Sequence, residues 1–117
     1  MESLGLHEYV LIRPQNSRKW KRFEAKIDTG AKWSRIGVRE AIKLGLGPIV
    51  DVLTITTGTG KERRIVVPAC VKIGKYRVAV RFTISTRRRE VLIGRRTIGK
   101  RFQVIPSEQY VTRVRKK

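Results

Sequence analysis

The sequence is poor in the residues on which disulfides, metal sites and cofactor loops depend. Its 117 residues include one cysteine, one histidine and nine acidic residues. Cys70 has no partner for a disulfide within the chain, which favours a reducing compartment, and we expect it to be a small buried apolar residue. Zinc sites need three or four suitably spaced ligands, and neither such spacing nor a Gly-x-x-x-x-Gly-Lys-Ser/Thr loop is present. We therefore expect no metal and no cofactor.

Long apolar runs are also missing. No segment approaches the roughly 20 apolar residues of a membrane-spanning helix. The first residues, among them Glu2, His7 and Glu8, lack the apolar run of a secretion signal. We expect a cytoplasmic protein that makes no membrane contact.

Positive charge, by contrast, is abundant. The 28 Lys and Arg residues against nine acidic ones give a net charge of +19. Such self-repulsion is relieved by a polyanionic partner, so nucleic acid, the ribosome and acidic peptides are candidates. A non-catalytic basic β-barrel that binds RNA or the ribosome is one interpretation, although only 7% of the residues are aromatic and no RNA-binding signature is present. Most of the basic runs are also explained as solvated surface.

Alternating apolar residues and turn signals predict an all-β domain. A short helix is expected over 38–44, ended by Gly45. Glycine-bearing turns at 58–61 and 74–75 predict two hairpins. Strands are expected over 8–14, 20–27, 50–57, 63–67, 71–73, 76–84, 91–93 and 102–105. The sequence thus predicts a single domain over 1–117, with its core at about 9–106 and a basic tail at about 107–117, folded as a small barrel or sandwich with one or two short helices.

One carboxylate has a distinctive position. Asp28 follows the predicted strand 20–27 and precedes Thr29 and Gly30. Glycine adopts positive φ freely and a threonine hydroxyl can bond nearby backbone, so this tripeptide is suited to a sharp turn that holds an acid in a fixed direction. An ordinary surface loop can contain the same three residues.

Further segments strengthen the interpretation of Asp28 as a functional residue. Residues 27–31 (Ile-Asp-Thr-Gly-Ala), the following 33–36 and short helix, a glycine-bearing hairpin at 56–60, and 92–94 (Leu-Ile-Gly) resemble a retropepsin-type aspartic protease in order and spacing. The segments 25–32, 62–67, 92–95 and 102–107 resemble the retropepsin-like endopeptidases often labelled ATP-dependent zinc proteases. That branch is associated with ligases that add glutamate tails to a ribosomal protein. The resemblance implies a closed barrel of the retropepsin (acid protease) type, and an aspartic endopeptidase acting on peptides or proteins, acidic ones included.

The resemblance also implies roles for the matching residues. Catalysis would fall to Asp28, Thr29 and Gly30, and substrate binding to Ala31, Lys32, Gly58, Thr59 and Gly60. Leu92, Ile93, Gly94 and Arg95 would support the active site. An ordinary hairpin turn is the alternative explanation for residues 58–60, and a plain core strand is the alternative for residues 92–94.

The chemistry requires a second carboxylate. Two carboxylates a few Å apart share one proton, so that one can remove a proton from water while the other polarises the peptide carbonyl. The chain has one Asp-Thr-Gly, and a two-fold homodimer would bring a second Asp28; the alternative is an inactive monomer. A dimer would also cover strands 9–12 and 102–105, which we expect to be exposed edges in a monomer.

Overall fold

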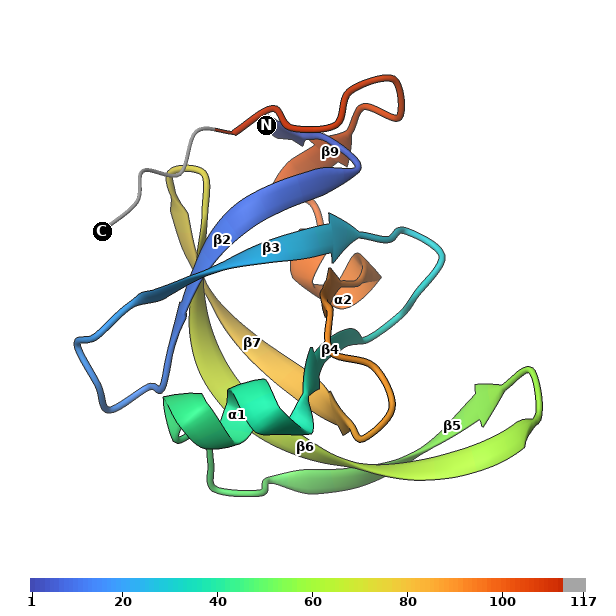
Figure 1. Cartoon of the computed structure of the whole chain (residues 1–117). Helices are drawn as coiled ribbons and strands as arrows, with labels where there is room; N and C mark the ends of the chain where they lie inside the picture. Colours follow the sequence, from blue (N-terminus) through green and yellow to red (C-terminus); the bar gives the residue numbers. More distant parts are fainter. Residues whose placement is uncertain (113–117) are drawn as a thin grey trace.

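The chain folds into a small β-barrel with two short helices on its surface (Figure 1). This computed structural model describes residues 1–112. The strands are β1 (Glu2–Leu4), β2 (His7–Arg13), β3 (Lys21–Ile27), β4 (Ser34–Gly37), β5 (Asp51–Thr57), β6 (Gly60–Ile73), β7 (Tyr76–Ser85), β8 (Val91–Ile93) and β9 (Phe102–Val104). The helices are α1 (Val38–Leu44) and α2 (Arg95–Ile98). The predicted class, an all-β closed barrel with short helices, is confirmed.

Strand pairing closes the barrel. The order is β2-β3-β8-β4-β7-β6, and β2 pairs with β6 to complete the ring. The first half of β6 runs beyond the barrel and pairs with β5, which forms a hairpin that projects from one side (Figure 1). The short strands β1 and β9 form a separate parallel pair.

The prediction for the middle of the chain is wrong in one respect, because 63–67 and 71–73 belong to one strand, β6. Alternation continues through Pro68: Val67, Ala69 and Val71 lie in the core, while Cys70 is half-buried on the outer side rather than buried as expected. Pro68 lies between the part of β6 that pairs with β5 and the part that pairs with β2. A residue without an N–H is tolerated there because β6 has only β7 beside it.

The expectation that strand 9–12 would be an exposed edge is wrong in part, because residues 11 and 12 of β2 pair with β3 on one side and with β6 on the other. Strand β9 pairs with β1 alone and therefore has one unpaired edge within the described residues, in line with the expectation for 102–105. The core begins before the expected residue 9, since Leu4 is fully buried. The first part of the expected tail also packs, because Leu6 and His7 donate backbone hydrogen bonds to Glu108 and Gln109. The remainder of that tail, 113–117, lies outside the described residues.

The helix prediction is confirmed at both ends. Helix α1 spans Val38–Leu44, and Gly45 closes it with a left-handed φ of 72°. Strands β1 and β4 and the position of α2 were not predicted, because three- and four-residue elements carry too little periodicity to be recognised. None of the helices within residues 1–112 has the length and apolar character needed to cross a membrane.

Candidate active site

The Asp28 loop is held between two parallel strands at one end of the barrel. Strands β3 and β8 are in register from Ala25 opposite Val91 to Ile27 opposite Ile93. Directly after this pairing, the Asp28 N–H donates to the carbonyl of Ile93 at 2.9 Å. The Asp28 carboxylate is half-buried, and its Oδ1 accepts the Gly30 N–H at 2.9 Å. The backbone and side chain of Asp28 are therefore both fixed by hydrogen bonds.

Gly30 acts here by its small size. It is not among the glycines with positive φ, so the conformational argument made from the sequence is wrong for this turn. A Cβ on Gly30 would lie 3.1 Å from Asp28 Oδ1, which is tighter than ordinary van der Waals contact. The absence of a side chain allows the carboxylate to lie close to the turn.

The far side of the loop is bonded to the start of α2. Arg95 donates its backbone N–H to the carbonyl of Ala31 at 2.7 Å, and Arg96 donates to Lys32 at 3.1 Å. The Arg95 guanidinium donates to the carbonyl of exposed Thr29 at 3.0 Å. The segment predicted to support the site, Leu92 to Arg95, thus lies beside the predicted catalytic turn.

Gly94 is the point of closest approach between the two segments. A Cβ on Gly94 would lie 2.6 Å from the Trp33 carbonyl oxygen and 2.9 Å from that of Ala31. Contacts this short to backbone atoms mean that a side chain at Gly94 would force the two segments apart. Glycine is therefore required for the Asp28 loop and α2 to pack together.

A buried hydroxyl beneath the loop was missed in the sequence. Ser34 accepts the Gly94 N–H on its Oγ at 3.1 Å and shares a 2.6 Å hydrogen bond with the Thr97 hydroxyl. Thr83 donates to the Ser34 carbonyl at 3.2 Å. These bonds satisfy polar groups that would otherwise be costly to bury, and no local signal distinguishes Ser34 from other strand serines.

A cavity of about 360 Å³ lies between the Asp28 loop and the β5–β6 hairpin. The loop contributes residues 30–33, and the hairpin contributes residues 55–57 and Arg64. Arg35, Thr83 and Leu92 complete the lining. A larger cavity of about 500 Å³ is lined by neither Gly30 nor the hairpin, so the smaller one is the cleft relevant to Asp28.

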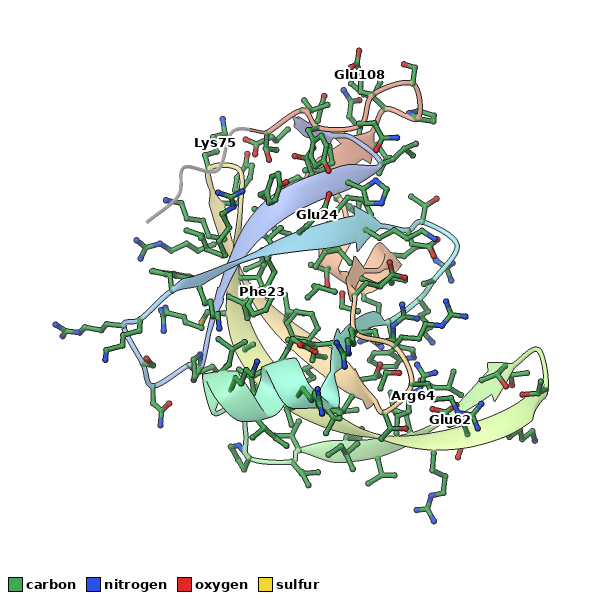
Figure 2. All side chains as sticks on the ribbon, viewed as in Figure 1. Phe23, Glu24, Glu62, Arg64, Lys75 and Glu108 are labelled. Atoms are coloured by element: carbon green, nitrogen blue, oxygen red, sulfur yellow. The ribbon has the colours of Figure 1, made fainter. Side chains whose placement is uncertain are left out.

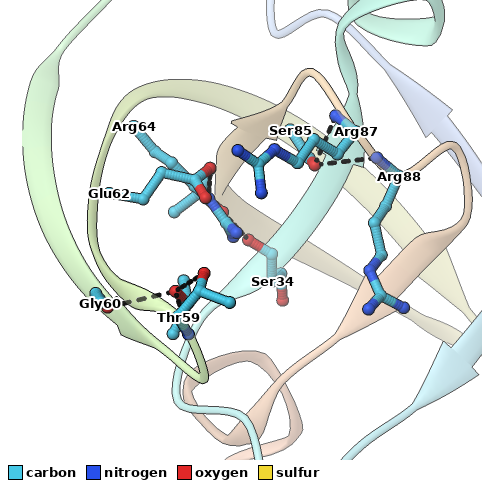
Figure 3. A network of polar contacts seen from close by, with 10 residues as sticks. Ser34, Thr59, Gly60, Glu62, Arg64, Ser85, Arg87 and Arg88 are labelled. Atoms are coloured by element: carbon cyan, nitrogen blue, oxygen red, sulfur yellow. Dashed lines mark hydrogen bonds and ion pairs between the residues drawn. The ribbon is translucent and has the colours of Figure 1, made fainter.

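The predicted flap glycines lie at the hairpin tip, outside this lining. Gly58 and Thr59 form the two-residue turn, and Gly60 begins β6 with a φ of 136°. The Thr57 hydroxyl donates to the Gly60 carbonyl at 3.1 Å, close to the tip shown in Figure 3. The structure thus places Ala31 and Lys32 at the cleft and places residues 58–60 above it, all three exposed.

The cleft is positively charged. Arg35 pairs with Glu90 at 3.1 Å and Arg64 pairs with Glu62 at 2.8 Å. Figures 2 and 3 show the second pair on the inner side of the hairpin. Within the described residues no carboxylate pairs with Lys32, and the lining itself contains Lys32, Arg35 and Arg64 but no carboxylate.

Burial and pairing change the acidities of two of these groups. Partial burial lowers the pKa of the Arg35 guanidinium, although Glu90 opposes the shift. The hydrogen bond from Arg64 lowers the pKa of the Glu62 carboxyl.

Arg64 was not predicted to line the cleft. The alternation of β6 nevertheless places it on the same face as Glu62 and buried Val66, so the sequence contains a signal for the face on which it lies.

The residues do not fit a bound metal. Within residues 1–112, no three His, Cys, Asp or Glu side chains gather in one place. The cleft beside Asp28 is lined by Lys32, Arg35 and Arg64 and by no histidine, cysteine or carboxylate.

Comparisons with known proteins agree with this architecture. EIAV protease, complexed with the inhibitor HBY-793, has a TM-score of 0.65 and 19% identity, covering 77% of this chain and 81% of the protease. Simian foamy virus (mac) protease has a TM-score of 0.55 and 13% identity, covering 77% of this chain and 90% of its own. A Legionella pneumophila protein of unknown function (DUF785) has a TM-score of 0.64 and 21% identity, covering 96% of this chain and 98% of its own.

Sequence comparisons gave nothing further. No protein-family model and no curated protein matches the chain. At 13–21% identity the structural likeness concerns the fold. The chain therefore has the retropepsin-like fold that its sequence predicted.

Proposed function

We propose that this chain is an aspartic endopeptidase that acts as a homodimer. The observation that carries the proposal is the position of Asp28: its carboxylate is fixed by the Gly30 N–H, beside a cleft that the β5–β6 hairpin covers. A carboxylate held at the end of a strand and next to a covered cleft can activate water against a peptide carbonyl. The hairpin would open to admit a substrate and close over it.

A two-fold axis near Thr29 would supply the second carboxylate. Thr29 and Gly30 are exposed, so this turn is free to meet its own copy. Two Asp28 carboxylates within a few Å cannot both ionise, and they would share one proton. The ionised member would take a proton from water while the protonated member donates a hydrogen bond to the carbonyl of the substrate. Exposed Thr29 would fix the two turns against each other.

The cleft favours acidic substrates. Lys32, Arg35 and Arg64 line it, and only the two arginines have carboxylate partners in the part of the chain described. A glutamate side chain of a peptide would replace water around Lys32 and gain Coulomb energy. Glutamate-rich peptides, such as the tails added to a ribosomal protein, are the proposed substrate class.

The catalytic proposal is tested by replacing each of the two aspartates. Asp28→Asn should lower kcat by about 100-fold or more, since it removes acid–base catalysis. Asp51→Asn is the matched control, because exposed Asp51 lies at the start of β5 and outside the cleft lining. Sedimentation velocity should show dimers for both variants. A monomeric wild-type protein, or equal activity of the two variants, would contradict the proposal.

The substrate class is tested with a panel of glutamate-rich and neutral peptides at low salt. Lys32→Gln should reduce kcat/KM for glutamate-rich peptides by about fivefold at most, since an exposed ion pair contributes about 1 kcal/mol or less. Neutral peptides should be unaffected. Lys75→Gln is the control, because Lys75 lies on the β6–β7 turn, away from Glu62 and Arg64 (Figure 2). Equal cleavage of both peptide classes would remove the electrostatic argument.

A further inference from the structure

A second basic surface lies on the outside of the barrel, around Trp20. Val10 and Ile12 of β2 point into the core, so Leu11 and Arg13 lie on the outer face. Leu11 is in register with Arg22 of β3 and with Lys72 of β6, and Lys72 is in register with Arg77 of β7. Registered residues point to the same face. We name this surface the Trp20 face, and it comprises Arg13, Arg18, Trp20, Arg22, Lys72 and Arg77.

Trp20 is the aromatic centre of this face. The Arg13 guanidinium carbon lies 4.8 Å from the Trp20 ring centroid, and that of Arg77 lies 5.8 Å from it. Arg13 also donates to the carbonyls of Pro14, Gln15 and Ser17, at 3.0, 3.1 and 2.7 Å. These bonds hold the β2–β3 turn in a fixed shape beside the ring, which lowers the conformational cost of binding a ligand.

The turn and the ring line an open cavity of about 490 Å³. Arg13, Arg18 and Arg77 line it together with Trp20 and the polar residues 15–17. The lining contains no carboxylate, and in the described part of the chain no carboxylate forms an ion pair with any cation of the Trp20 face. The charge of this cavity is therefore uncompensated.

The Trp20 face is separate from the Asp28 cleft. Trp20 precedes β3 and Asp28 follows it, and the residues that line the cavity beside Trp20 and those that line the cleft do not overlap. Figure 1 shows the β2–β3 turn and the β5–β6 hairpin on opposite sides of the barrel. A ligand on the Trp20 face would leave the cleft open.

We propose that the Trp20 face binds single-stranded nucleic acid, with a base stacked on Trp20 and phosphates bound by the surrounding cations. Unpaired bases stack on aromatic rings and on guanidinium planes, and both are offered here. The amides of Gln15 and Asn16 can bond base edges. An acidic peptide would use the charge but would leave the ring and the amides without a role. A duplex would keep its bases stacked and out of reach.

Binding is tested on the full chain with a fluorescein-labelled 12-nucleotide RNA of mixed sequence, by fluorescence anisotropy across a salt series. Trp20→Leu should weaken binding about fivefold or more, the lower end of the effect of removing one stacking platform. Arg18→Gln/Arg77→Gln, both exposed, should reduce the slope of log K against log salt by about 1.4, because each lost phosphate contact on a single strand contributes about 0.7. DNA of the same sequence shows which of the two nucleic acids is preferred.

Two controls separate this site from the general charge of the protein. Arg39→Gln/Arg89→Gln removes the same charge from two exposed residues, Arg39 on α1 and Arg89 near it, and should leave the affinity nearly unchanged. In a Trp33→Phe background Trp20 is the remaining tryptophan of the chain, and RNA should quench its fluorescence. Equal weakening by both arginine pairs would overturn the proposal, as would an absence of quenching, tighter binding of a 12-base-pair duplex, or poly-glutamate binding with the same dependence on Trp20.

Discussion

Replacement of Gly94 by alanine tests how the Asp28 loop is held. Gly94 has φ of −96° and ψ of 179°, which any residue adopts. The cost of alanine is therefore steric. Its Cβ would lie 2.6 Å from the carbonyl oxygen and 2.7 Å from the carbonyl carbon of Trp33. Because these are backbone atoms, which cannot rotate away as a side chain can, the two segments must separate, and overpacking of this kind costs about 1–3 kcal/mol.

Thermal unfolding at a fixed protein concentration measures this cost. With an unfolding entropy of about 2.1 cal/mol/K per residue, 1–3 kcal/mol corresponds to a fall in Tm of about 4–12 °C. Peptidase activity should fall even at temperatures at which the variant is fully folded, since the segment that is displaced carries Asp28. Gly58→Ala is the matched control, because no heavy atom lies within 4 Å of its new Cβ; its Tm should change by about 2 °C or less. A Gly94→Ala protein as stable as the wild type would refute the steric argument.

Two further predictions concern the C-terminal segment. Buried Glu8 accepts hydrogen bonds from the N–H groups of Gly5, Val111 and Thr112 and from the Thr112 hydroxyl. Glu8→Gln places an NH₂ donor against donors and should cost about 2–3 kcal/mol in urea unfolding, whereas exposed Glu108→Gln should cost nothing measurable. Tyr110 donates a hydrogen bond to the Glu24 carboxylate, which raises the pKa of Tyr110 from 10.0 to about 12. The stability from this bond is present below pH 10 and is lost as the pH rises through about 12. Difference absorbance against Tyr110→Phe measures the titration, and a midpoint near 10 would contradict the bond.

Much of the fold could be predicted because it is encoded locally. The two-residue alternation along β6 and β7 fixes which side chains face the core, and Gly45 ends α1 wherever the helix packs. The order of Asp28, Thr29 and Gly30 directly after a strand predicts a turn that holds the carboxylate, without reference to other parts of the chain. These features depend on neighbours within a few residues, so the sequence alone determines them.

Only the tertiary structure could decide what surrounds that acid. The requirement for glycine at position 94 arises from the backbone of Trp33, some sixty residues earlier in the chain, and Arg64 lies over the cleft only because the β5–β6 hairpin bends toward the loop. The pairing of β2 with β6, which removes the edge expected at residues 11 and 12, likewise joins distant segments. Which distant strands pair, and whether the sheet closes into a barrel, is set by packing over the whole core, so a local pattern does not contain this information.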